Sequence, residues 1–266
     1  MPFLDLDSIR LFYKDNGEGP TVVFIHPPLL TSANFDYQVD ELSRHFRVIT
    51  FDIRGHGRSP YSTEPITYSI IVEDIKNLLD SLEIDKAFLC GYSTGGSIVF
   101  EFLQSYADRA LGGIVISGMS EVSDWYLEKR ISMASLLSKP RMIGLLGLAI
   151  SWGNSNTKEN FRHMYRESLK GDSRNIKQYY SYSLRYRCTH QLDRIHHPIL
   201  LIYGKKDKTF HKYAKILHEK LPYNQLKFID EKHQIPTKSA TELNSLISEF
   251  ILAFRGRKGD ENLFEI

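Results

Sequence analysis

A serine stands at the centre of the run Gly91-Tyr92-Ser93-Thr94-Gly95. Glycine two residues before and two residues after a serine suits a sharp turn from a strand into a helix, because a Cβ at either position would clash with the chain. Such a turn exposes the hydroxyl oxygen, and the first N–H groups of the helix face developing negative charge. The pattern therefore predicts that Ser93 is a nucleophile and that the N–H of Thr94 stabilises an oxyanion.

A nucleophilic serine needs a base and a carboxylate, and the second half of the chain offers both. Asp207 follows a predicted strand by four residues, and His233 follows another strand, before the last predicted helix. A serine hydroxyl is a weak nucleophile until a base takes its proton, and serine, aspartate, histidine is one known chain order of such a triad. We predict that His233 is the base and that Asp207 orients it. Alternatively, Asp207 is a turn residue or helix cap, and Asp230 takes the acidic role.

The other polar residues indicate no metal chemistry. The chain has ten histidines, but no H-E-x-x-H or comparable ligand spacing. We therefore expect neither a metal nor a cofactor. Turns or helix surfaces account for six further histidines, which are His26, His56, His196, His197, His211 and His218.

The elements that must position these residues alternate along the chain between strands and helices. Continuous runs of β-branched and aromatic residues are typical of strands buried on both faces of a parallel sheet, and apolar residues at i, i+3, i+4 and i+7 indicate an amphipathic helix. The fold class is therefore α/β, with a mainly parallel sheet flanked by helices. The predicted strands are 3–7, 9–13, 21–25, 48–51, 87–90, 113–116, 199–203 and 226–229, and the helices outside the insert described next are 68–82, 97–106 and 243–254.

One long segment interrupts this alternation. Residues 121–197 contain helical patterns and no strand-like run, with breaks at Pro140, Gly153 and Gly171. An all-helical insert between two strands of a parallel sheet is most simply a lid over the carboxyl edge, where such folds hold their sites. We predict a core domain of residues 1–120 and 198–266 and a helical cap of residues 121–197, called the insert below.

Aromatic residues are frequent in the insert, which holds both tryptophans and six of the tyrosines. Aromatic side chains at helical spacing usually pack a helix against its neighbours. Some of them are nevertheless expected to line a pocket above Ser93.

Four motifs make essentially the whole chain resemble the α/β-hydrolase superfamily. The resemblance implies the lidded single-domain branch that includes esterases, C–C bond hydrolases and cofactor-free haloperoxidases. A nucleophilic aspartate would imply a dehalogenase or an epoxide hydrolase, and Ser93 argues against both. The motifs are His26-Pro27-Pro28, the D-x-R-G-x-G-x-S segment from Asp52 to Ser59, the run from Gly91 to Gly95, and Gly204-Lys205-Lys206-Asp207 with His233.

The sequence departs from this family at the second oxyanion donor. Relatives usually have His-Gly-X after the third strand, where the N–H of X is the donor, but Pro28 aligns with X and has no N–H, and Pro27 has none either. Either the loop shifts so that the N–H of Leu29 serves, or Thr94 remains the one strong donor, which would cost about 2.7 to 4 kcal/mol. Alternatively, the segment only rigidifies the turn, with His26 hydrogen-bonded locally.

The overall composition excludes several classes of protein, and the distribution of charge differs between regions of the chain. With 266 residues, 42% hydrophobic and 25% charged, the chain is neither disordered nor collagen-like. A net charge of +2 is far from that of a dedicated nucleic-acid binder. The insert, however, holds 13 Lys and Arg against 7 Asp and Glu, so a basic insert covers an acidic core. Either the two attract each other, or the insert attracts an anionic substrate or an acidic partner.

The expected location follows from segments that the sequence lacks. The N-terminus shows no basic region followed by an apolar one, and the longest apolar stretch, residues 142–150, is about half a bilayer span. Two cysteines allow at most one disulfide, which favours a reducing compartment. We expect a cytoplasmic protein without a membrane span, and the sequence leaves the oligomeric state open.

These features predict a serine hydrolase that cleaves a small ester or related acyl compound through an acyl-enzyme intermediate. Two alternatives use the same residues. One is a slow-turnover ligand receptor or signalling protein of the same fold, and the other is a lyase or perhydrolase.

Overall fold

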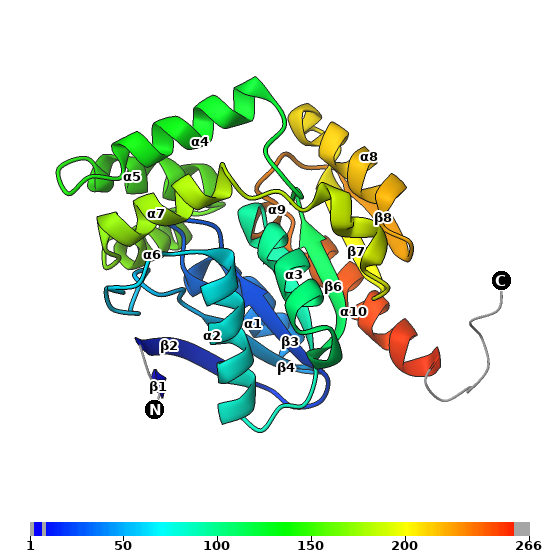
Figure 1. Cartoon of the computed structure of the whole chain (residues 1–266). Coiled ribbons are helices and arrows are strands. Elements are labelled where there is room, and N and C mark those ends of the chain that lie inside the picture. Colours follow the sequence, from blue (N-terminus) through cyan, green and yellow to red (C-terminus); the bar gives the residue numbers. More distant parts are fainter. Residues whose placement is uncertain (1–2, 7–8, 258–266) are drawn as a thin grey trace.

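Within residues 3–6 and 9–257, which the computed structural model describes, eight strands form one sheet (Figure 1). Their order is β1-β2-β4-β3-β5-β6-β7-β8. β2 runs antiparallel to both of its neighbours, and β3 to β8 run parallel to one another. The strands are β1 Phe3–Leu6, β2 Ile9–Asn16, β3 Thr21–Ile25, β4 Arg47–Phe51, β5 Ala87–Tyr92, β6 Ala110–Ile116, β7 Ile199–Gly204 and β8 Asn224–Ile229.

The α/β class and the parallel sheet are thus confirmed, and side-chain alternation explains how the sheet is covered. Successive side chains of a strand point to opposite faces. In β5, Ala87 and Leu89 join one apolar cluster with α2, α3 and α8, whereas Phe88 and Cys90 join a second cluster with α1 and α10. The helices outside the insert are α1 Asp36–Leu42, α2 Tyr68–Ser81, α3 Thr94–Ser105, α8 His211–Lys220, α9 Ile235–Lys238 and α10 Ala240–Arg257.

The insert lies between β6 and β7 and is helical, as predicted (Figure 1). Pro140 and Gly171 lie between its helices, whereas Gly153 lies in the last turn of a helix rather than at a break. Asp124, Thr157 and Asp172 cap three helix N-termini by accepting hydrogen bonds from backbone N–H groups. The helices are α4 Trp125–Leu137, α5 Ile143–Asn154, α6 Lys158–Ser168 and α7 Ser173–Ser183.

The insert packs on the sheet-bearing part without a separate core. Its buried residues Leu127, Ile176 and Tyr179 belong to the same apolar cluster as Ile71 of α2. The two ends of the insert lie side by side, because Glu121 forms an isolated β-bridge with Arg187. Met164 of α6 belongs to the second cluster, so the insert contacts the apolar clusters on both faces of the sheet.

Membrane crossing requires a helix of about 20 largely apolar residues. In the described ranges, no helix combines that length with a sufficiently apolar composition.

Candidate active site

The turn from β5 into α3 has the strained geometry that the glycine spacing predicts. Ser93 has φ 54° and ψ −120°. A Cβ on Gly91 would lie 2.2 Å from the carbonyl oxygen of Gly95, and a Cβ on Gly95 would lie 2.3 Å from that of Ile25. A non-glycine residue with positive φ is held only by its surroundings, so the turn is a site of stored strain that presents the Ser93 side chain.

The structure brings Ser93, His233 and Asp207 together at the carboxyl ends of β5, β8 and β7. His233 Nδ1 donates to Asp207 Oδ2 at 2.8 Å, and His233 Nε2 lies 3.1 Å from Ser93 Oγ. Asp230, the alternative acid, is 70% exposed and pairs with Lys206 at 3.1 Å. The geometry therefore favours Asp207 as the partner of the imidazole.

The surroundings of His233 hold its ring and limit water around its carboxylate partner. The ring centroid lies 4.3 Å from that of Phe210 and 5.4 Å from that of Tyr92. Burial, with the nearby Asp207 carboxylate, raises the pKa of the Tyr92 and Tyr203 hydroxyls, which stay neutral. Since Asp207 accepts the proton on Nδ1, the lone pair of Nε2 faces the Ser93 hydroxyl, which is the tautomer that a base requires.

The loop after β3 is fixed by hydrogen bonds from two directions. His26 Nε2 accepts from Ile53 N at 2.9 Å, and its Nδ1 donates to Pro27 O at 2.9 Å. Burial lowers the pKa of His26 to about 4, so the ring is neutral at ordinary pH. From the insert, the hydroxyl of Tyr179 donates to His26 O at 3.0 Å. His26 is thus hydrogen-bonded locally, as one of the three alternatives for this segment expects.

Leu29 and Thr94 keep unbonded N–H groups next to this loop and turn. Leu29 has φ 71° although it is not glycine, so packing imposes a left-handed conformation on the residue that follows Pro28. Thr94 is the first residue of α3, where helix N–H groups have no intrahelical acceptor. Neither N–H donates a hydrogen bond within residues 3–6 and 9–257, so both stay available to a ligand.

The D-x-R-G-x-G-x-S segment after β4 serves the structure rather than the site. The carboxylate of Asp52 accepts from Ser32 N and Arg58 N, each at 2.8 Å. Ser59 Oγ donates to Asp52 O at 2.6 Å and accepts from Phe12 N at 2.9 Å. These bonds tie the loop after β4 to β2 and to the loop after β3.

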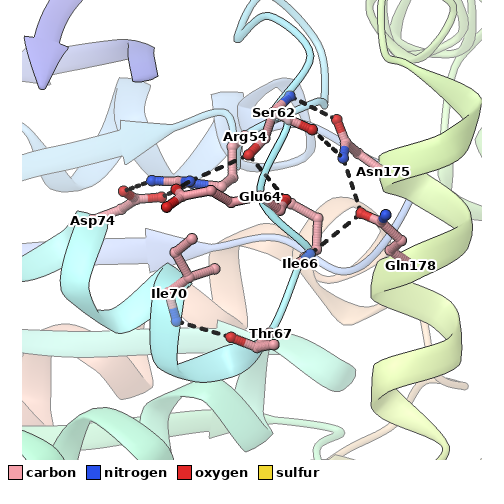
Figure 2. A network of polar contacts seen from close by, with 9 residues as sticks. All are labelled: Arg54, Ser62, Glu64, Ile66, Thr67, Ile70, Asp74, Asn175 and Gln178. Atoms are coloured by element: carbon pink, nitrogen blue, oxygen red, sulfur yellow. Dashed lines mark hydrogen bonds and ion pairs between the residues drawn. The ribbon is translucent and has the colours of Figure 1, made fainter. Parts of the chain in front are cut away.

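Arg54 of the same segment is buried in a polar network (Figure 2). Its guanidinium, 2% exposed, bonds both carboxylate oxygens of Asp74 at 2.6 and 2.7 Å and one of Glu64 at 2.7 Å. Both carboxylates come from outside the motif, so the sequence pattern did not reveal them. Arg54 and Asp74 are both buried, and the attraction between their opposite charges offsets part of the free-energy cost of removing them from water.

The same network reaches the insert. Asn175 of α7 accepts from Ser62 N at 2.9 Å and donates to Ser62 O at 3.1 Å (Figure 2). Gln178, one turn later, accepts from Ile66 N at 3.3 Å. Helix α7 is therefore attached to the loop that leads into α2 by paired amide contacts.

A second attachment of the insert lies beside the three clustered residues. Tyr92, directly before Ser93, donates its hydroxyl to Asn154 Oδ1 at 2.9 Å. Thr237, in α9 just after His233, donates to the backbone oxygen of Asn154. The last residue of α5 thus contacts the neighbours of both Ser93 and His233, a link that sequence patterns did not indicate.

Two other kinds of ligand site, a metal centre and a surface groove, were compared with this cluster of residues. Across the described residues, no group of three or more His, Cys, Asp or Glu side chains is arranged to hold a metal ion. A groove of about 780 Å³ lies at the opposite edge of the sheet, beside the starts of β3 and β4, and is lined in part by Arg47 and Asp15. These two form an ion pair at 2.7 Å, so each neutralises the other's charge.

Comparison with known proteins agrees with the fold described above. The sequence profile described as alpha/beta hydrolase fold matches residues 20–143. The AB hydrolase superfamily protein YisY of Bacillus subtilis (strain 168) is 24% identical over 257 residues, covering 92% of this chain and 96% of its own. The human protein named serine hydrolase BPHL is 24% identical over 268 residues, covering 92% of this chain and 84% of its own.

Two solved structures share the fold. The enol-lactonase from Burkholderia xenovorans LB400 superposes with a TM-score of 0.84 at 20% identity, covering 94% of this chain and all of its own. A thermophilic esterase from Thermogutta terrifontis superposes with a TM-score of 0.79 at 21% identity, covering 92% of this chain and 94% of its own. At such identities the likeness establishes the fold alone.

Proposed function

The chain belongs to the α/β-hydrolase superfamily, and from that premise we propose that it is a serine hydrolase acting on a small ester or related acyl compound. The observation that carries the proposal is the chain of contacts from Asp207 through His233 to Ser93, at 2.8 and 3.1 Å. The names of similar proteins, an enol-lactonase, an esterase and a serine hydrolase, support hydrolysis of an acyl bond.

The proposed reaction has two stages. Ser93 Oγ attacks the acyl carbonyl while His233 Nε2 takes its proton, and the imidazolium then protonates the leaving alcohol. In the second stage His233 deprotonates a water molecule, which attacks the acyl-enzyme carbonyl. The imidazolium then returns the proton to Ser93 Oγ as its bond to the acyl carbon breaks and the acid leaves. Asp207 holds the ring in the required tautomer and stabilises the imidazolium, so it acts without itself taking a proton.

The oxyanion of each tetrahedral intermediate needs donors near Ser93. We assign this role to the N–H groups of Thr94 and Leu29, which have no acceptor in the described residues. The N-terminus of α3 adds a favourable dipole for negative charge. Leu29 then replaces the donor that Pro28 lacks, which is consistent with its left-handed backbone.

The insert is proposed to act as a lid that shapes the substrate pocket. Its attachment through Asn154 supports this role, since that residue bonds Tyr92, directly before Ser93, and Thr237, four residues after His233. We place the core domain at residues 1–120 and 198–266 and the cap at residues 121–197. The closed base at Glu121 and Arg187 supports a boundary near residue 121.

The test combines covalent labelling with turnover. We expect a fluorophosphonate probe to label the wild-type protein and not Ser93→Ala, and p-nitrophenyl acetate or butyrate to be hydrolysed by the wild type alone. Circular dichroism establishes that the variant is folded. Equal labelling of both proteins, or equal hydrolysis, would sink the proposal.

A receptor-like role with slow turnover is the second candidate, because Pro28 stands where relatives usually supply the second oxyanion donor. Loss of one oxyanion donor costs about a hundred- to a thousandfold in rate. Stopped-flow hydrolysis separates the two roles. A full burst of p-nitrophenol followed by very slow release of acid favours the receptor, whereas steady turnover of about 1 to 10³ per second favours the enzyme.

A further inference from the structure

Helix α5 of the insert presents an apolar face to solvent. Leu145, Leu148 and Trp152 are 62%, 44% and 63% exposed. Their spacing of three and four residues places them on one side of the helix, while Leu146 and Ser151 on the other side are buried. Exposed apolar side chains gathered on one helix face are typical of an interaction surface.

Exposed cations lie just before α5 and on the helix that packs against it. Arg141 precedes α5, and Arg162 and Arg166 lie one turn apart on the exposed side of α6. The two helices pack together, since the Trp152 and Phe161 rings lie 5.3 Å apart. Leu145, Leu148, Trp152, Arg141, Arg162 and Arg166 are called the α5–α6 face below.

The positive charge of the α5–α6 face is not neutralised by the protein. None of its three arginines forms an ion pair with any residue of the described ranges. Residues 139–166 hold five Lys and Arg and a single acidic residue, Glu159. The nearest further carboxylate along α6, Glu167, is buried and already pairs with Arg58 and Lys170.

From these observations we propose that the α5–α6 face binds an anionic lipid surface. Leucine and tryptophan on one side of a helix, with long cationic side chains before it and on its partner helix, match the boundary between acyl chains and anionic headgroups. The apolar groups enter the boundary, and the arginines extend toward the phosphates. Association is peripheral, because no helix in the described residues could cross the membrane.

The α5–α6 face is connected to the turn that bears Ser93. α5 ends at Asn154, which bonds Tyr92 beside Ser93. The lipid-binding helix and the turn that bears Ser93 are therefore one hydrogen bond apart. Lipid binding itself requires no hydrolysis, so its test does not depend on the proposed function.

The first experiment measures binding to vesicles of phosphatidylcholine with and without an equal share of phosphatidylglycerol. We expect the protein to sediment with the anionic vesicles at least about tenfold more strongly, and to be released as salt rises from about 0.1 M to about 0.5 M. Trp125→Phe leaves Trp152 as the single tryptophan, and its emission should shift to the blue on binding. Equal affinity for both vesicles, or an unshifted emission, would overturn the proposal.

Paired variants separate this face from general surface chemistry. Leu145→Ser with Leu148→Ser, and Arg141→Glu with Arg162→Glu, should each lower vesicle binding at least about tenfold. The matched control is Leu252→Ser with Lys220→Glu, which removes an exposed leucine and an exposed lysine outside the insert. Circular dichroism establishes folding of each variant. An equal loss in the control contradicts the assignment to this face.

Light scattering without vesicles tests the competing occupant, a second copy of the chain. We expect the same molar mass for the wild type and for Leu145→Ser with Leu148→Ser. A wild-type dimer that this double variant turns into a monomer would assign the face to self-association and overturn lipid binding.

Discussion

Two segments at the carboxyl edge of the sheet carry polar residues and differ in how these are hydrogen-bonded. They are residues 52–59 after β4, called the β4 corner, and residues 91–95 at the end of β5, called the β5 corner. After β4, Arg54 is 2% exposed and its guanidinium bonds two carboxylates. After β5, the Ser93 hydroxyl lies 3.1 Å from the imidazole of His233, which is 18% exposed. Both corners lie at carboxyl ends of parallel strands, where this type of fold places functional residues.

The difference teaches that a polar cluster at this edge is not in itself a reactive one. Around Arg54 the polar groups satisfy each other, and the cluster attaches α7 to the loop before α2. Around Ser93 donors are left over, on Thr94 and Leu29. Spare N–H donors next to a partly exposed imidazole are what the proposed reaction requires of this corner.

The largest expected effect is on turnover at the β5 corner. Asp207→Asn should lower kcat about 10⁴-fold, because the amide favours the wrong tautomer of His233. Ester hydrolysis at substrate saturation measures it. Asp230→Asn is the matched control and should keep wild-type kcat, since Asp230 pairs with Lys206 on the surface. The reverse result would move the acidic role to Asp230.

The next effect is on stability at the β4 corner. Arg54→Met should lower the free energy of unfolding by about 3 to 5 kcal/mol, because it leaves Asp74 buried without its cation. Urea denaturation measures it, and the folded fraction should still hydrolyse ester. Arg174→Met breaks an exposed pair with Asp172 and should leave the urea midpoint unchanged. Comparable losses for both variants would remove the distinction between buried and exposed pairs.

Acid should weaken the protein through the two buried histidines His26 and His56. Burial lowers the pKa of His26 to about 4, and burial with the nearby His26 lowers that of His56 to about 3. The unfolded chain binds these protons below about pH 6.5, so stability falls as pH falls from about 6.5 toward 4, by about 3 kcal/mol for each ring.

His56→Phe tests this pH dependence, since phenylalanine keeps ring packing against Tyr179 and cannot titrate. Urea denaturation between about pH 7 and 4.5 should show a shallower fall in stability for the variant than for the wild type. Parallel curves would show that His56 does not contribute.

The smallest effect concerns the attachment of the insert at the β5 corner. Asn154→Ala removes the acceptor of the Tyr92 hydroxyl and should lower kcat up to about tenfold, in line with the loss of one hydrogen bond. Asn156→Ala is the control, because the Asn156 side chain accepts from Tyr37 of α1 at 2.8 Å and not from Tyr92. Equal kcat values for the two variants would show that the Tyr92 contact does not position Ser93.

The sequence predicted those parts of the fold that depend on local chemistry. Parallel strands such as β3 are buried over their whole length, so they read as unbroken apolar runs. The start of β6 was missed, because Ala110 to Gly112 has no β-branched residue and its pairing supplies the structure instead. Ser93, Asp207 and His233 were predicted as candidates, since each follows a strand end, and their roles stay proposals.

Contacts between distant segments were beyond sequence patterns. The partner of Arg54, Asp74, lies on the face of α2 that folding brings beside the loop after β4. Asn154 ends an almost wholly apolar helix, and nothing local indicates that it meets Tyr92. Pro28 showed that a donor is missing, whereas the left-handed backbone of Leu29 became visible only in the folded loop.

The two ends of the insert lie side by side, so the segment between them could be exchanged for another. Beside the Glu121 to Arg187 bridge, Cys188 N donates to Ser120 O at 3.1 Å, so the chain leaves and re-enters the core at one place. A different helical hairpin could be grafted between these two points without lengthening any connection. Such a graft would have to replace three contacts, which are the Tyr179 hydroxyl on the loop after β3, Asn154 on Tyr92 and Asn175 on Ser62. Chimaeras that keep these three contacts would test whether the insert sets the proposed substrate preference.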